Sequence, residues 1–501
     1  MVESDRPASQ IVRAKLIKSK AKRSSVNGEQ VSLKIPLTHT PTMNRLRPLV
    51  LFFALVSLLF AGPAREQGIH KSYTPSCGTW DVVFSPSPNG NGSLVGVAHV
   101  PGTVELWSVG NYNANFHWQT LIEHWDGTSW QVVGSPNHPS ANHFLYGVTA
   151  VAPNDVWAVG RYEPDTGGTS TLTLHWDGTN WSTVPSPNPA TYSGLYAVAA
   201  ASATDVWAVG YYYSKSGQRT LIEHWDGTSW SIIASPNVGT HDNLLRAVAV
   251  VPNSQTVWAV GYYYRNDGNP STLVQRWNGS AWSVVASPDG STRENYLTGV
   301  SSTGPNDAWA VGYYNNPNGL YLPLTEHWDG NTWQVVPSPD LSSSLTAVTA
   351  VLSLSPNDVW AVGTYYGSSA QLTLAQHWDG TSWQVFSTPN PAGSDFGAIN
   401  AFDSVAIVPG VGVWAAGYYE VTQPAKPSQT LTAFYCPVGS PTPTPTPTPT
   451  ATITPTPTVT PSATPTATPT ATGTPRPSPS PRSRPTPRAR ATSGSQTVMP
   501  W

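Results

Sequence analysis

Short apolar segments alternate with polar turns through the middle of the chain, and the pattern recurs about every 50 residues. Residues 195–234 show one complete unit. Its four predicted strands, which we call a to d, are residues 195–200, 206–212, 220–225 and 230–234. Strand c is followed by Asp226-Gly227, and glycine accepts the positive φ of a tight turn. Short strands separated by such turn signals indicate an all-β protein.

Two motifs mark the repetition. The tryptophan of the strand-b motif VWAVG occurs at seven places, namely Trp107, Trp157, Trp207, Trp258, Trp309, Trp360 and Trp414. The first tryptophan of the HWDGTSW motif, at the end of strand c, occurs at six, namely Trp125, Trp176, Trp225, Trp277, Trp328 and Trp378. Four-stranded units of this length are typical of propeller blades. We therefore predict an all-β, seven-bladed β-propeller over residues 77–436, with disordered termini.

The two ends of the repeat array complement each other. The last copy stops after its strand c, at Tyr435, whereas residues 78–83 look like a strand d with no strand c before them. We predict that this N-terminal segment is the outer strand of the seventh blade and closes the ring. Cys77 and Cys436 both fall where the other copies have their c–d turn, so we predict that they form a disulfide. The alternative is two unrelated cysteines.

Composition limits the classes of function. Charged residues make up 11% of the chain, which disfavours helix bundles and long amphipathic helices. Residues 65–439 carry 10 Lys and Arg against 25 Asp and Glu. An acidic body of this kind argues against nucleic acid as a partner.

The N-terminal region contains the only long apolar run, residues 49–62. It is shorter than the ~20 residues of a membrane span and suits a secretory signal, with Arg45 and Arg47 before it and small residues up to Ala64. We predict a start at Met43, a signal peptide at 43–64, and residues 1–42 as a gene-model extension or a disordered basic leader. The protein would then be secreted or at the cell surface, with no membrane span in the mature chain. The alternative is a long cytoplasmic tail on an uncleaved anchor.

Residues 440–501 are rich in proline and threonine and contain five arginines but no acidic residue. They cannot bury a core, and we predict an extended, disordered stalk. Its arginines could associate with an anionic cell-wall polymer, and the alternative is a soluble spacer.

The order VWAVGYYY, variable loop, TLIEHWDGTSWSIIASPN resembles a kelch repeat, and HWDGTSW is also similar to tectonin-type lectin repeats. The likeness covers residues 77–436 and is to secreted bacterial propellers of this type. It departs from kelch at Gly210 and Gly261, where one glycine rather than two ends strand b. The resemblance implies a platform for binding protein or glycan. Copper oxidases with kelch repeats need a Tyr–Cys crosslink, and no cysteine is spare here, so that activity is not carried over.

Several polar residues recur in most units and are best interpreted as structural. The histidines at the end of strand c are His124, His175, His224, His327 and His377, with Arg276 in the remaining copy. Each is on a different blade, so they would not converge on one metal ion, and we predict no metal and no cofactor. We expect the aspartates of the a–b and c–d turns to accept backbone N–H bonds; they are Asp155, Asp205, Asp307, Asp358, Asp126, Asp177, Asp226, Asp329 and Asp379. The repeated tryptophans should form the core between blades.

The b–c loops, in contrast, differ in length and chemistry from copy to copy, which marks the face that is free to acquire function. Tyrosines at the base of these loops are candidate ligand-binding residues, namely Tyr162, Tyr213, Tyr264, Tyr314, Tyr366 and Tyr419. The alternative for each is packing between blades. We predict an extracellular, non-catalytic recognition or adhesion module, not an enzyme, that binds a glycan or a protein through the face of the b–c and d–a loops. A sialidase-like glycoside hydrolase is the alternative. It would need converging arginines, and these are few in the repeats, namely Arg161, Arg219, Arg246, Arg265, Arg276 and Arg293.

Overall fold

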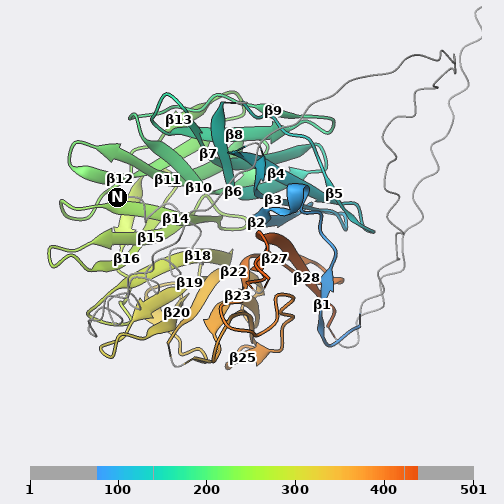
Figure 1. Cartoon of the computed structure of the whole chain (residues 1–501). Helices are drawn as coiled ribbons and strands as arrows, with labels where there is room; N and C mark the ends of the chain where they lie inside the picture. The colour runs from blue at the N-terminus through green and yellow to red at the C-terminus, as the bar shows by residue number, and fades with distance from the viewer. Residues whose placement is uncertain (1–75, 115, 139, 343, 423, 438–501) are drawn as a thin grey trace, which may run out of the picture. The chain divides into compact units, whose positions relative to one another are not determined.

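The computed structural model describes residues 76–437, apart from residues 115, 139, 343 and 423 (Figure 1). The predictions for residues 1–42, 43–64 and 440–501 lie outside the described residues. The described part consists of β-strands and one 3₁₀ helix, η1 (Pro88–Gly90). It contains no helix long and apolar enough to cross a membrane.

The strands form five separate four-stranded antiparallel sheets and one eight-stranded sheet. In the order a to d, the separate sheets are β2 (Gly92–His99), β3 (Leu106–Ala114), β4 (His117–Trp125) and β5 (Trp130–Val132); β6 (Ala141–Ala152), β7 (Asp155–Pro164), β8 (Ser170–Trp176) and β9 (Trp181–Thr183); β10 (Ser193–Ser202), β11 (Asp205–Ser214), β12 (Gly217–Trp225) and β13 (Trp230–Ile232); β14 (Asn243–Val250), β15 (Val257–Tyr264), β16 (Pro270–Trp277) and β17 (Trp282–Val285); and β18 (Asn295–Gly304), β19 (Asp307–Asn315), β20 (Tyr321–Trp328) and β21 (Trp333–Val335).

The eight-stranded sheet contains two such units. One is β22 (Thr346–Ser355), β23 (Asp358–Tyr366), β24 (Gln371–Trp378) and β25 (Trp383–Phe386); the other is β26 (Ile399–Val408), β27 (Gly412–Glu420), β28 (Gln429–Tyr435) and β1 (Trp80–Val83). A single parallel pair, Gln371 with Ile399, joins the two units. Repeated four-stranded antiparallel sheets of this kind are the blades of a β-propeller. We number the units 1 to 7 from β2 and assign β1 to unit 7.

Tryptophans join each unit to the next, as predicted. Trp107 of unit 1 packs against Trp176 and Trp181 of unit 2, with ring centroids 5.0 and 5.3 Å apart. The equivalent contacts between later units are Trp157 with Trp225 and Trp230, Trp207 with Trp277 and Trp282, Trp258 with Trp328 and Trp333, Trp309 with Trp378 and Trp383, and Trp360 with Tyr435 and Trp80.

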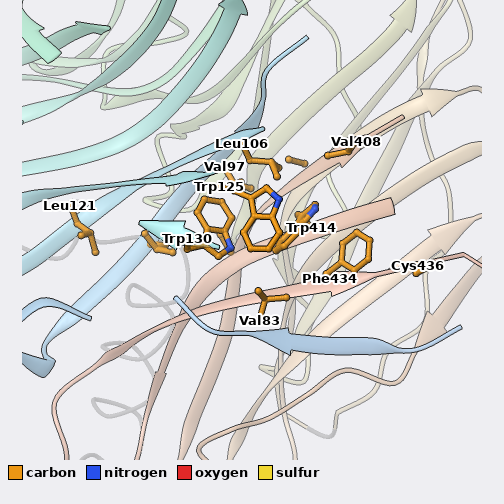
Figure 2. Packing of buried hydrophobic residues seen from close by; sticks show 13 residues of the cluster. Val83, Val97, Leu106, Leu121, Trp125, Trp130, Val408, Trp414, Phe434 and Cys436 are labelled. Carbon is orange, nitrogen blue, oxygen red and sulfur yellow. The ribbon is translucent and has the colours of Figure 1, made fainter. Parts of the chain in front are cut away.

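The same arrangement connects the last unit to the first. Trp414 of β27 lies 4.8 Å from Trp125 and 5.7 Å from Trp130 of unit 1. Figure 2 shows these rings together with Val83 and Phe434 in one buried cluster. The first strands also contact one another in order, β2, β6, β10, β14, β18, β22 and β26, and β26 contacts β2.

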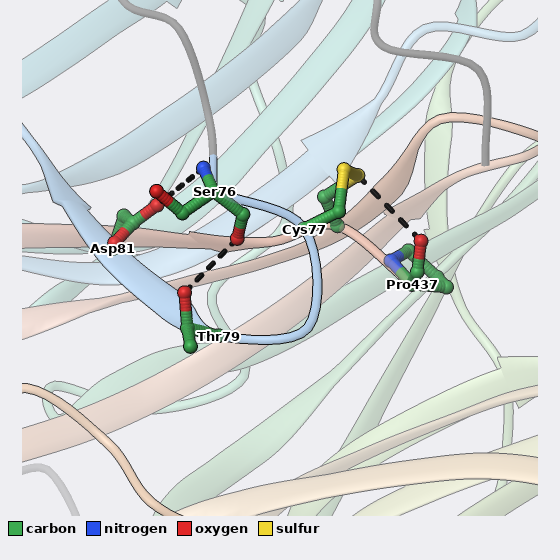
Figure 3. The surroundings of a disulfide bond; sticks show 6 residues. Ser76, Cys77, Thr79, Asp81 and Pro437 are labelled. Carbon is green, nitrogen blue, oxygen red and sulfur yellow. Dashed lines mark hydrogen bonds between the residues drawn. A yellow bond between two sulfur atoms is a disulfide. The ribbon is translucent and has the colours of Figure 1, made fainter. Parts of the chain in front are cut away.

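The N-terminal strand completes unit 7, as predicted. β1 pairs antiparallel with β28, with Trp80 opposite Tyr435. Cys77 and Cys436 form a disulfide at this position, with Cα atoms 4.4 Å apart (Figure 3). The N–H of Gly78 also donates to the carbonyl of Cys436. The bond therefore stands where the other units have a continuous c–d turn.

Candidate functional site

Antiparallel strands place the a–b and c–d turns at one end of each unit and the b–c and d–a connections at the other. We call these the turn end and the loop end. The two ends use their polar residues differently, and this difference locates the candidate site.

At the turn end, the c–d aspartates hold their own turns, as predicted. Oδ1 of Asp126 accepts hydrogen bonds from the backbone N–H groups of Thr128 and Ser129, at 2.8 and 2.9 Å. The same pair of bonds is made by Asp177, Asp226, Asp329 and Asp379, and by Asn278 in unit 4. Hydrogen bonds from a threonine hydroxyl and two N–H groups lower the pKa of Asp226 to about 2.

The aspartates that open strand b have a different partner from the one predicted. Oδ1 of Asp155 lies 2.8 Å from Nε2 of His175, a strand-c ring, so the expected backbone donors are replaced by a side chain. The equivalent pairs are His224 with Asp205, His327 with Asp307 and His377 with Asp358, and His124 pairs with Glu105.

Each of these histidine rings also lies on the strand-b tryptophan, with centroids 4.3 to 4.6 Å apart. In unit 4 the guanidinium of Arg276 takes this place over Trp258. The histidines are thus tied to the packing between units. In the part of the chain that the structure describes, no three His, Cys, Asp or Glu residues gather as metal ligands would.

Each first strand contains a β-bulge at the same point. In β10 the register shifts between Leu195 and Ala197, so Tyr196 is the extra residue. The equivalent residues of units 1, 2, 4, 5, 6 and 7 are Val95, Tyr146, Arg246, Thr298, Thr349 and Asp403. Bulges redirect side chains and are frequent beside binding sites.

The glycine of the VWAVG motif makes the bulge possible. A Cβ atom on Gly210 would lie 2.0 Å from the carbonyl oxygen of Gly194 on the bulged strand. The corresponding distance is 1.8 to 2.1 Å in all seven copies of this glycine. Such an approach admits no side chain, so the bulge explains why a glycine stands at this position in every unit.

The seven bulge residues line one cavity of about 180 Å³, which we call the axial cavity. Every unit contributes to it through its first strand. A cavity of this volume has room for several waters or for one small polar molecule, but not for a folded segment. Its charged lining residues are Arg246 and Asp403, three units apart along the chain.

Two arginines extend the polar surface from this cavity toward the loop end. The guanidinium of Arg246 lies 4.1 Å from the ring centroid of Tyr196, and its Nη2 donates to the hydroxyl of Tyr262 at 3.4 Å. Nη1 of Arg161 donates to the hydroxyl of Tyr211 at 3.3 Å. Because the rings of Tyr196 and Tyr211 lie 5.4 Å apart, these contacts form one continuous row.

The row continues into unit 5. Tyr262 packs on Tyr296, and Tyr296 on Tyr313. The carboxylate of Glu294 accepts hydrogen bonds from the hydroxyls of Tyr321 at 2.8 Å and Tyr296 at 3.3 Å. Burial raises the pKa of both Tyr296 and Tyr321, so their hydroxyls remain hydrogen-bond donors at neutral pH. We define the tyrosine belt as Arg161, Arg246 and Glu294 together with the rings of units 3 to 5, namely Tyr196, Tyr211, Tyr262, Tyr296, Tyr313 and Tyr321.

The six tyrosines predicted from the sequence divide into two groups. Tyr213, Tyr264 and Tyr366 are the third residue after the strand-b glycine and pack in the cluster that contains the belt. Tyr314 and Tyr419, the second residue after it, pack in the cores between units. Tyr162, also a second residue, lies against His143 at 5.9 Å. Successive side chains of a strand point to opposite faces, so the two groups cannot share one site.

Sequence reasoning missed the bulge residues, notably Tyr196 and Arg246. A signal for the bulge positions is present: the residue after the buried leucine of strand a changes from copy to copy, as in Leu145-Tyr146-Gly147 and Leu245-Arg246-Ala247. Its neighbours stay apolar or small. The inward direction of that residue follows only from the bulge, which alternation does not reveal.

No family model and no curated protein matches the chain. Among solved structures, "YCF48 bound to D1 peptide" is 15% identical, with 73% of this chain and 99% of that chain covered and a TM-score of 0.42. The SapL1 lectin in complex with alpha methyl fucoside is 15% identical, with 58% and 94% covered and a TM-score of 0.37. The GH74 xyloglucanase from Xanthomonas campestris is 13% identical, with 70% and 55% covered and a TM-score of 0.43. All are β-propeller proteins, and the likeness is one of fold.

Proposed function

We propose that this protein is a secreted, closed, seven-bladed propeller with kelch-like blades on a Pro/Thr-rich stalk, and that it is a non-catalytic recognition or adhesion module for a glycan or a protein. The observation that carries the proposal is the bulge. One repeated glycine holds the same bulge in every unit, yet the bulge residue is Val, Tyr, Arg, Thr or Asp. A constant framework that presents a variable residue to a shared cavity suits ligand recognition.

The distribution of engaged side chains supports the loop end as the binding surface. Turn-end aspartates are held by their own turns or by histidines. The loop end holds the tyrosine belt and the cavity-lining bulges. The disulfide and the absence of a membrane-crossing helix among residues 76–437 are compatible with an extracellular protein.

A glycoside hydrolase is the second candidate. Glu294 accepts a hydrogen bond from Tyr321, and a tyrosine with a neighbouring carboxylate is the kind of nucleophile that sialidases use. Two arginines, Arg161 and Arg246, also belong to the tyrosine belt. We rank recognition first because Arg161 pairs with Glu163 at 3.0 Å, and because neither Tyr321 nor Glu294 lines the axial cavity.

The test is to probe the purified protein against arrays of glycans and surface peptides, and then to repeat the positive signals with two variants. Tyr213→Ala with Tyr264→Ala should abolish binding per folded molecule, because these rings belong to the belt's cluster. Asp226→Ala, at the turn end, should leave binding intact. Binding lost only with Asp226→Ala would place the binding surface at the turn end and contradict the proposal. If the protein hydrolyses a glycoside of the array and Glu294→Gln abolishes that activity, the result would favour the glycoside hydrolase instead.

A further inference from the structure

Resting on the proposed function, we propose that the axial cavity binds a terminal carboxylated sugar, of the uronic- or sialic-acid class. Arg246 binds the carboxylate, and Asp403 accepts hydrogen bonds from the ring hydroxyls.

Positive charge is scarce in residues 76–437 and is concentrated at their loop end. Residues 76–437 contain eight Lys and Arg against 24 Asp and Glu. Seven of the eight lie in the loops or strand halves of the loop end, namely Arg161, Lys215, Arg219, Arg246, Arg265, Arg293 and Lys426, and Arg276 is at the turn end. An anionic group is therefore repelled less at the loop end than at the turn end.

Arg246 is the cation that reaches the cavity. The bulge of β14 directs it inward, and Tyr196 supports its guanidinium at 4.1 Å. The hydroxyl of Tyr262 accepts from Nη2, which fixes the orientation of the planar group. A guanidinium held in this way is preorganised for bidentate binding of a carboxylate. Aromatic rings around it also lower the local dielectric and strengthen the interaction.

The opposite side of the cavity requires a ligand with more than a carboxylate. Asp403, the bulge residue of β26, presents an acceptor there, and a second carboxylate on the ligand would be repelled by it. Sugar hydroxyls supply donors for Asp403 and partners for the hydroxyls of Tyr146 and Tyr196, which also line the cavity. The cavity's volume of about 180 Å³ suits a single ring.

A peptide fits these observations less well. Peptides commonly bind sheets through backbone hydrogen bonds to a free strand edge. In the five separate sheets the first strand is an edge strand, paired only with strand b, but the cavity of about 180 Å³ that the first strands share has no room for an added strand. The recognition chemistry is therefore that of guanidinium, carboxylate and phenol groups, which matches a polyhydroxylated acid.

The experiment compares matched pairs of methyl glycosides by titration calorimetry: glucuronide with glucoside, and galacturonide with galactoside, with methyl α-N-acetylneuraminide as a third arm. Each matched pair differs only in a carboxylate replacing a hydroxymethyl group. At least one of the three acidic glycosides should bind more than tenfold tighter than the neutral glycosides. Arg246→Gln should weaken binding of that glycoside roughly 10- to 100-fold, as expected for loss of a charge-assisted hydrogen-bonded pair. Arg246→Lys keeps the charge without the planar fork and should give an intermediate loss.

Lys215→Gln is the matched control, because it removes a positive charge from an exposed loop of the same end without touching the cavity. It should change the affinity less than twofold. Equal binding of acidic and neutral sugars, or an acidic preference that survives Arg246→Gln in a folded variant, would overturn the inference. Binding of peptide C-termini in place of sugars, lost with Arg246→Gln, would overturn the sugar assignment while leaving recognition at the loop end intact. If no array ligand loses affinity when loop-end residues are replaced, the proposed function itself would be overturned.

Discussion

The turn end and the loop end of the molecule are built from the same strands but treat their polar groups in opposite ways. At the turn end, side chains such as Asp226 and His224 recur from unit to unit, and each has a partner within its own unit. At the loop end, the equivalent positions differ between units, and the aromatic and charged groups contact neighbours from other units, as Arg246 contacts Tyr196. Recurrence within this chain therefore marks structure, and departure from the repeat marks the surface available for binding.

The bulge combines a residue that recurs in every unit with a residue that varies between units. The strand-b glycine is as constant as any turn-end residue, yet its effect is to turn a variable residue toward the axis. A feature that looks purely structural in the sequence thus creates the positions on which the candidate site depends.

The disulfide between Cys77 and Cys436 should have the largest effect on stability. Cys436→Ser should lower the free energy of unfolding by about 2–5 kcal/mol, because the disulfide spans a sequence separation of 359 residues and constrains the unfolded chain. Chemical denaturation measures the loss, and binding by the folded fraction should be unchanged. Mass spectrometry of non-reduced peptides that finds two free thiols in the purified protein would contradict this prediction.

The glycine opposite the bulge should have the next largest effect on stability. Gly210→Ala should cost about 2–4 kcal/mol, because its Cβ would meet the Gly194 carbonyl at 2.0 Å and the bulge would have to shift. Gly134→Ala is the control, since nothing lies within 4 Å of the added atom, and it should cost less than about 0.5 kcal/mol. Equal losses in the two variants, measured by thermal unfolding, would show that the close approach is not limiting.

Buried glutamates between units predict a pH dependence. Glu123, Glu223 and Glu326 lie in strand c without exposure to solvent, and burial raises the pKa of each to about 8. Units 4 and 6 carry Gln275 and Gln376 at this position, and both amides donate to a backbone carbonyl of the preceding unit.

A neutral side chain thus fits this position, and a folded pKa above the unfolded value means that the free energy of unfolding falls as pH rises from about 4.5 to about 8. Replacing Glu123, Glu223 and Glu326 together by Gln should remove this slope. The free energy of unfolding should rise by at least about 2 kcal/mol at pH 8 and change little at pH 4.5. Unfolding midpoints across this range check it, and an unchanged slope would show that these carboxyl groups do not titrate as expected.

The smallest effect is expected at a single turn. Asp226→Ala should lower the unfolding midpoint slightly through the loss of two side-chain to backbone hydrogen bonds. Asp226→Asn should cost little, because Asn278 makes the same bonds in unit 4. A larger loss for Asn than for Ala would mean that the carboxylate charge matters at the turn end.

Much of the architecture could be predicted from the sequence because its determinants are local and repeated. The strand periodicity, the Asp-Gly turns and the position of Cys77 and Cys436 all follow from spacing. The site was harder to predict because it depends on a backbone irregularity. Alternation assigns Tyr213 and Tyr314 to opposite faces once the register is known, but the sequence offers no direct sign that Tyr196 and Arg246 point inward. That direction comes from the bulge opposite a glycine that, in the sequence, looks like an ordinary strand end.

The most direct test of the central claim is the affinity of Tyr196→Thr for the tightest array ligand, measured per folded molecule. Threonine is the native bulge residue of units 5 and 6, at Thr298 and Thr349, so the change respects the framework while removing a ring from the axial cavity. We predict that the variant remains folded, with an intact all-β circular dichroism spectrum, and binds at least tenfold more weakly. Wild-type affinity in the folded variant would contradict the claim that the bulges form the binding site.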